Sequence, residues 1–229
     1  GHVSQLRPKT EFETPRALAT EEIPGIVQQY RRAAELGKQA GFDGVEIHGA
    51  NGYLIDQFLH RNSNHRTDAY GGSIMNRARF LLAVTDAVLG VWEPGRVGMH
   101  LAPRGDAHDV GRGNLRTQFI HVASELGKRG IAFICAREPW DGDEIGPELK
   151  EAFGGVFIAN QGFTQDTAEA AVASGKADAV AFGKLFISNP DLPGRFETRA
   201  PLNEPDPETF YGSDPKGYTD YPMIAREAC

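Results

Sequence analysis

Five short apolar runs recur along the chain, and a longer segment with helical spacing of apolar residues separates each run from the next. Runs of four to five residues are typical of buried strands, and the longer segments between them are typical of helices. Strands that alternate with helices predict βαβ units and therefore a parallel sheet. The predicted strands are Val45–His48, Val97–Leu101, Ile131–Cys135, Gly155–Ala159 and Ala179–Gly183.

The segments before and between the strands predict five helices. In the first, Glu21 and Glu22 place negative charge in the opening turn, where it complements the helix dipole, and the glycines at 41 and 44 end the helix. The expected helices cover residues 20–40, 76–89, 115–129, 149–153 and 167–174. Residues 1–229 are expected to form one domain, with 190–229, rich in Pro, Asp and Gly, as an irregular segment that wraps around it.

The pattern alone leaves two α/β architectures open, a (β/α)8 barrel and an open doubly wound sheet. No Gly-x-Gly-x-x-Gly run follows a strand, which disfavours a dinucleotide-binding fold of the second kind. Eight β/α units usually need about 250 residues, whereas this chain displays only five units. In both architectures ligands bind at the carboxyl ends of the strands, so the candidate site is the same.

Composition narrows the class of partner. The 229 residues are 40% apolar and 24% charged, which is typical of a globular domain. A formal charge of −7 with scattered Lys and Arg disfavours nucleic acid and indicates a small-molecule partner. Cys135 and Cys229 suggest no disulfide framework or metal spacing, and we expect a cytoplasmic protein. No 18-residue apolar stretch or signal-peptide pattern appears, so no membrane association is expected.

The strongest chemical signal follows the first predicted strand. His48 ends the strand, and Asn51 and Tyr53 come three and five residues later, so one turn can bring all three to a single pocket. Two neutral hydrogen-bond donors and a phenol are suited to gripping an oxygen and delivering a proton. The alternative is structural, with His48 satisfying a core backbone group and Tyr53 packing.

Several separated motifs occur together, in one order, over nearly the whole chain. They are Thr14–Leu18, His48–Phe58, Arg66–Ser73, Ala181–Leu192, Phe210–Gly212 and Gly217–Pro222. By these motifs the chain resembles the Old Yellow Enzyme family of FMN-dependent ene-reductases, especially the bacterial branch that acts on enones, morphinone-like ketones, nitrate esters and maleimides. The resemblance implies an FMN-binding (β/α)8 TIM barrel that is incomplete here, with strands four to eight present.

The resemblance also implies roles for the first motif. His48 and Asn51 would hydrogen-bond the carbonyl or nitro oxygen of the substrate, and Tyr53 would protonate the alpha carbon. Trp140 and Tyr211 correspond to loops that line the substrate cavity in relatives, and core or lid packing is an equal alternative for each.

Cofactor contacts are implied at other strand ends. Gln161, Gly162, Gly183 and Lys184 match positions that hold the FMN phosphate, with lysine in place of the family's arginine and therefore without its bidentate fork. His100 stands where the family has an arginine that faces the flavin, and a histidine is mostly neutral at pH 7. Arg104 is a partial substitute, although a surface role is the alternative.

Two further features of the motifs are structural. Ser73 is expected to cap the following helix, and Met75 replaces a glutamate that is usual in the family. The remaining histidines, His60, His65, His108 and His121, share no metal-ligand spacing.

The leading hypothesis is an NAD(P)H:FMN ene-reductase, with NADH and NADPH both possible reductants. The second is a catalytically impaired remnant that acts as an interaction or scaffold protein, or whose open sheet edges are covered by a homo-oligomer or a complementing chain. A third is a flavin-free lyase that uses Tyr53 as its acid.

Overall fold

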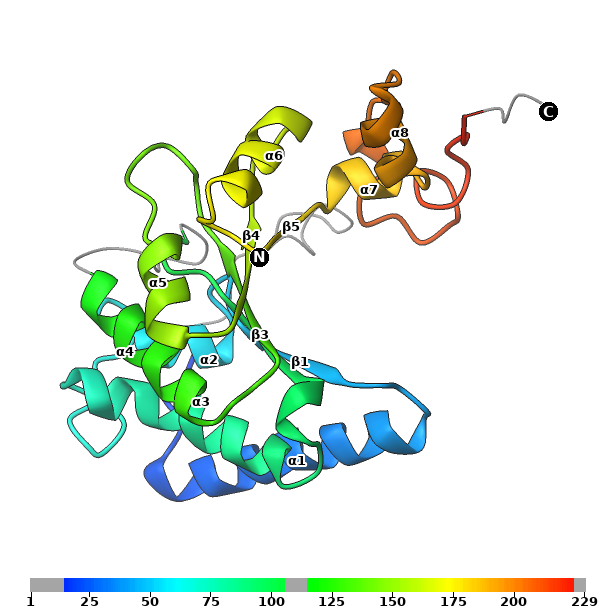
Figure 1. Cartoon of the computed structure of the whole chain (residues 1–229). Coiled ribbons are helices and arrows are strands. Elements are labelled where there is room, and N and C mark those ends of the chain that lie inside the picture. Colours follow the sequence, from blue (N-terminus) through cyan, green and yellow to red (C-terminus); the bar gives the residue numbers. More distant parts are fainter. Residues whose placement is uncertain (1–14, 106–114, 225–229) are drawn as a thin grey trace. The chain divides into compact units, whose positions relative to one another are not determined.

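The structure is a computed structural model that describes residues 15–105 and 115–224. It divides into two compact units, of which one comprises residues 15–180 and the other, in its described part, residues 181–224 (Figure 1). Thr14, His108 and Cys229 lie outside the described residues.

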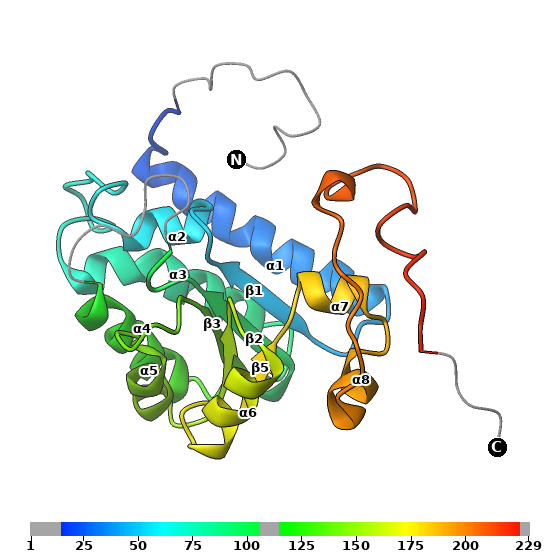
Figure 2. The same cartoon turned by 90° about the horizontal axis from the view of Figure 1, so that it is seen from above.

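The first unit is built on the predicted sheet. Five strands lie side by side in the order in which they occur in the sequence, and the first four pair in parallel (Figure 2). The α/β prediction of five β/α units is therefore confirmed. The strands are β1 (Val45–Gly49), β2 (Val97–Leu101), β3 (Phe133–Arg137), β4 (Val156–Asn160) and β5 (Ala179–Ala181).

Helices follow the strands as βαβ logic requires. Ser73 caps α3 as predicted, because its Oγ accepts a hydrogen bond from the Asn76 N–H. The helices of the first unit are α1 (Ile23–Gln39), α2 (Leu54–Leu59), α3 (Ile74–Leu89), α4 (Arg116–Lys128), α5 (Gly146–Phe153) and α6 (Gln165–Ala173), with 3-10 turns η2 (Thr20–Glu22) and η3 (Pro94–Arg96). Helix α2 was not among the predicted helices.

The second unit contains α7 (Lys184–Ser188), α8 (Leu192–Thr198) and the 3-10 turn η5 (Pro207–Thr209). The expectation that 190–229 is irregular is wrong for α8, because its proline lies in the first turn, where a missing N–H costs nothing. Arg195 is buried and ties this unit together by donating to Asp191, to the Pro201 carbonyl and to the Pro222 carbonyl. That this segment wraps around a single domain stays a prediction.

The core lies between the sheet and the helices. Ile47, Met99, Ile134 and Phe157 are register partners across four strands, and each is at least 95% buried. Helices α1, α3, α4 and α5 run along this side of the sheet (Figure 1). Since side chains alternate along a strand, the next row projects to the opposite face.

That opposite face carries the next register row, His48, His100, Cys135 and Ile158. His48 is exposed, and Val156, on the same face, is 47% exposed. In a closed barrel this face is the packed interior. The five described strands therefore form an incomplete barrel whose inner face is open.

Close packing of α4 on α5 depends on Gly127. A Cβ at this position would lie 2.2 Å from the Phe153 carbonyl oxygen at the end of α5, so neither helix has room for a side chain there. Gly25, in the first turn of α1, has no such neighbour within 4 Å.

We expect Gly127→Ala to lower the free energy of unfolding by about 1–3 kcal/mol, because the backbone of one helix must move away from the other. Gly25→Ala is the matched control and should raise stability by up to about 1 kcal/mol through helix propensity. Urea unfolding followed by circular dichroism measures both. Equal midpoints for the two variants would contradict the packing described.

Candidate active site

Three of the predicted residues meet at the carboxyl end of the sheet. His48 of β1 and His100 of β2 are register partners, and their ring centroids are 5.3 Å apart at 77°. The Tyr53 ring also lies next to His48, with 5.5 Å between the ring centroids. Tyr53 is 50% exposed, so its phenol is accessible from solvent. The structure thus brings His48 and Tyr53 together, as their spacing in the sequence suggested, and places His100 beside His48.

The turn between β1 and α2 is held in a left-handed conformation. Asn51 has φ 59° and Gly52 has φ 74°, and Asn and Gly are the residues that adopt this region most readily. Asp56 accepts the Gly52 N–H at 2.8 Å with Oδ2, and its Oδ1 lies 2.9 Å from His60 Nε2. Asp56 and His60 are both fully buried. Their spacing of four residues, with His60 directly after α2, was the signal in the sequence for this contact.

Arg137, at the end of β3, is the site residue that sequence reasoning missed. Its Nη1 donates to Asn51 Oδ1 at 3.1 Å and so links the third strand to the first turn. Arg137 lies two residues beyond Cys135, the partner of His100, and therefore on the same face of the sheet. The available signal was its place at the carboxyl end of a strand in that alternation.

His100 is neutral at pH 7. Burial, with smaller contributions from His48 and Arg137, lowers the pKa of His100 to about 4. Its Nε2 is buried and has no hydrogen-bond partner among the described residues. Buried polar atoms usually have a partner, so this nitrogen marks a place where a bound group can supply one.

Because the folded state holds His100 neutral, the unfolded chain binds more protons between about pH 6.5 and pH 4. The contribution of His100 to the free energy of unfolding is therefore fully present above about pH 6.5. It is lost as the pH falls towards 4, by up to about 3 kcal/mol at about 1.4 kcal/mol per pH unit. We expect His100→Asn to remove this part of the pH dependence in urea unfolding at pH 7.5 and 4.5. An unchanged slope in the variant would show that His100 is not held neutral.

Trp140 lies in the loop after β3. Its ring centroid is 5.0 Å from that of Phe163, and its Nε1 is buried without a partner among the described residues. Arg104 fixes the same loop by donating to the Pro139 carbonyl and to both carboxylate oxygens of Asp141. Arg104 thus has the structural role that was the alternative to a flavin contact. A cavity-lining role for Trp140 stays a prediction.

The predicted phosphate residues divide between the two units. Gln161 and Gly162, after β4, have φ 96° and 78°, so two consecutive residues adopt left-handed backbone just before α6. Gly183 and Lys184, at the start of α7, belong to the second unit together with Tyr211. Phosphate binding by the four, and a substrate contact from Tyr211, stay predictions.

Two buried acid groups are structural. Glu138 accepts the Ile145 and Gly146 N–H groups, and burial raises its pKa. Burial raises the pKa of the Cys135 thiol to about 12, so Cys135 is not a nucleophile at neutral pH. No group of three or more metal-ligating side chains occurs in the described ranges, and no helix there is long and apolar enough to cross a membrane.

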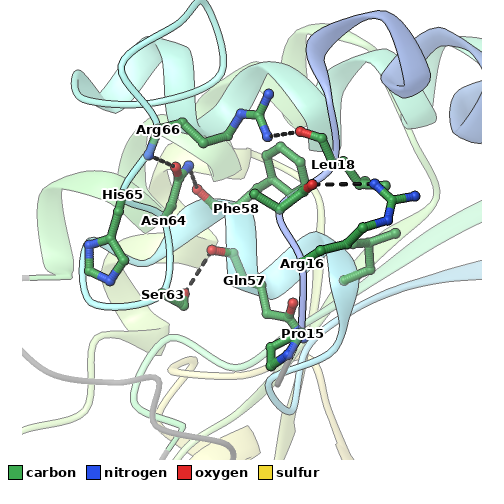
Figure 3. Close-up of a pocket in the computed structure, with 11 residues that line it drawn as sticks. Pro15, Arg16, Leu18, Gln57, Phe58, Ser63, Asn64, His65 and Arg66 are labelled. Carbon is green, nitrogen blue, oxygen red and sulfur yellow. Dashed lines mark hydrogen bonds between the residues drawn. The ribbon is translucent and has the colours of Figure 1, made fainter. Parts of the chain in front are cut away.

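A cavity of about 430 Å³ lies beside this site and contains none of the predicted residues (Figure 3). Its polar side chains are largely engaged with the chain itself, since Asn64 donates to two carbonyls and Arg66 donates to the Leu18 carbonyl. Arg66 also pairs with Asp68, whose pKa it lowers. This cavity is therefore lined by three stretches that are separate in the sequence, 15–18, 54–58 and 63–66, and its polar groups join them to one another.

Comparison with known proteins identifies the family. The profile of the NADH:flavin oxidoreductase / NADH oxidase family matches residues 3–203. The chain belongs to this family. The position of the site at the strand ends is consistent with membership of this family.

Two curated relatives of this oxidoreductase family illustrate the match. The chain is 47% identical to 12-oxophytodienoate reductase 2 of Arabidopsis thaliana, over 96% of this chain and 61% of the relative. It is 44% identical to a probable flavin mononucleotide-dependent alkene reductase of Leishmania infantum, over 93% of this chain and 59% of the relative. The chain thus spans about three fifths of the length of these relatives.

Solved structures agree. Morphinone reductase superposes with a TM-score of 0.88 at 46% identity, covering 93% of this chain and 59% of that enzyme. The Old Yellow Enzyme homologue of Zymomonas mobilis gives 0.90 at 42% identity, covering 94% and 63%. The resemblance to the Old Yellow Enzyme family and the incomplete-barrel fold are therefore confirmed.

Proposed function

We propose that this chain carries the substrate half of an FMN-dependent ene-reductase that uses NADH or NADPH to reduce the activated C=C bonds of enones, nitro-alkenes and maleimides. Nitrate esters, which are reduced at the nitro group and not at a C=C bond, are a further substrate class. The observation that carries the proposal is the cluster of His48, Tyr53 and His100 at the strand ends, with Asn51 fixed in the turn beside it.

His48 and Asn51 bind the carbonyl or nitro oxygen of the substrate. Two hydrogen-bond donors stabilise the negative charge that grows on that oxygen. The same contacts orient the alkene. The half-exposed Tyr53 then donates its phenolic proton to the alpha carbon and regains one from solvent.

One observation supports a fit between these residues and a flavin. The unpartnered, neutral Nε2 of His100 is a donor or acceptor for the polar edge of the isoalloxazine ring. Gln161, Gly162, Gly183 and Lys184 would hold the phosphate, as the family resemblance implies. When bound, FMN supplies the hydride that it has received from the nicotinamide.

The reaction is tested with 2-cyclohexen-1-one as the probe. Tyr53→Phe should slow alkene reduction by about 10²–10⁴-fold, the range for loss of a general acid. The same variant is expected to leave flavin reduction by NADH or NADPH, measured anaerobically without alkene, within a factor of about two. Equal loss in both half-reactions would contradict the role of Tyr53.

The open inner face indicates that the site needs further parts of the barrel to complete it. Strand β1 is one edge of the described sheet, and its residues Glu46 and His48 are exposed on the inner face. An unpaired edge strand offers its backbone groups to another strand. We propose that further β/α units of the barrel add at the β1 edge and cover this face, as part of the same polypeptide, in a homo-oligomer or as a complementing chain.

Completion is tested by supplying a separate polypeptide that corresponds to the amino-terminal two fifths of morphinone reductase. We expect the mixture to form a complex and to take up FMN, seen as the visible flavin band, at least tenfold more tightly than the chain alone. Equal uptake by a monomeric chain without the fragment would contradict the need for completion. No uptake in either case would overturn the proposed function.

A further inference from the structure

Arg137 makes one contact that the proposed chemistry does not yet use, the hydrogen bond from its Nη1 to Asn51 Oδ1 at 3.1 Å. We propose that Arg137 is a positioning residue that fixes the Asn51 side-chain amide so that its NH2 group faces the substrate oxygen. This inference rests on the proposed function for the substrate, and its first test does not require flavin.

The orientation follows from the chemistry of the two side chains. A guanidinium group only donates hydrogen bonds, so the Asn51 atom that faces it must be the carbonyl oxygen. The NH2 group then lies on the other arm of the planar amide. Without such a partner an asparagine amide can turn over and present its oxygen, and an amide oxygen would repel a substrate carbonyl instead of binding it.

The backbone of the turn fixes the position of Asn51 and leaves the rotation of its side chain to be set. Asn51 is held at φ 59° beside Gly52, whose N–H is bound by the buried Asp56 carboxylate. The direction of the Asn51 Cα–Cβ bond is therefore fixed by the turn. What remains is rotation of the side chain, and the contact with Arg137, 86 residues later in the sequence, fixes it.

The charge of Arg137 adds a second effect. Hydrogen bonds with one ionised partner are stronger than neutral ones, and a bond to the amide oxygen polarises the N–H groups at the other end of the amide. Arg137 also contributes to lowering the pKa of His100, which is an independent sign that its positive charge reaches the site. The guanidinium thus strengthens Asn51 as a donor.

The first test follows the Asn51 amide by 15N NMR in the full chain without flavin. The resonance pair of its side chain is assigned by its absence in Asn51→Gly, a change that the left-handed backbone tolerates. In Arg137→Met we expect the order parameter of this amide to fall below about 0.6, the range of flexible groups. Arg137→Lys, which retains the charge and N–H donors, should restore part of the order.

Arg104→Met is the matched control, because Arg104 also follows a strand of the sheet but pairs with Asp141. It should leave the Asn51 amide unchanged. If Arg137→Met leaves the Asn51 amide as ordered as in the wild-type chain, the inference is overturned, whatever the fate of the proposed function.

The second test is a double-mutant cycle with 2-cyclohexen-1-one in the flavin-loaded, completed protein. We expect Arg137→Met alone to lower kcat/KM about tenfold and Asn51→Gly alone about 100-fold, the latter in the range for loss of an oxyanion donor. In the Asn51→Gly background, Arg137→Met should cause no further loss. Full tenfold loss in that background would show that Arg137 does not act through Asn51.

Discussion

The buried carboxylate of Asp56 is the interaction on which the candidate site depends. One oxygen accepts the Gly52 N–H and the other contacts His60, and both side chains are fully excluded from solvent. Removing one partner of such a buried pair usually costs about 3–5 kcal/mol, because the other is left without compensation. Loss of this contact would therefore destabilise the turn that carries Asn51 and Tyr53.

The support for this turn comes from helix α2, which starts directly after Tyr53. Asp56 lies within α2 and His60 follows directly after its last residue, where the His60 ring contacts the Asp56 carboxylate. The short helix thus serves as a fixed base for the loop. Tyr53 remains half exposed while the groups beneath it are buried, so its phenol is held firmly at a surface that a substrate can reach.

The sequence predicted the elements that are marked by apolar runs. All five strands were found, and β1 to β4 each carry an apolar residue that is buried against the helices: Ile47, Met99, Ile134 and Phe157. The bounds were less certain, and β3 starts two residues later than expected, at Phe133. Short helices were missed, because α2 and α7 have six and five residues and give little periodicity to detect.

The site was predicted to a similar degree and for a related reason. His48 and Tyr53 are close in sequence as well as in space, so one turn brings them together. His100 was found by resemblance, and its neutrality follows from burial and from neighbours that spacing does not reveal. Arg137 was missed because its contact with Asn51 spans 86 residues and depends on strand register.

The arrangement of charge at the strand ends has a physical logic. The Asn51 amide, which carries no charge, can donate to a growing negative charge on the substrate oxygen without first having to be stripped of tightly bound water. A cation in direct contact with the substrate oxygen would bind the ground state strongly as well, and such uniform binding does not accelerate the chemical step. Arg137 supplies positive potential without touching the substrate, because its guanidinium donates to the Asn51 amide oxygen at 3.1 Å. The amide then acts as the contact group, and the cation sets its direction and its strength as a donor.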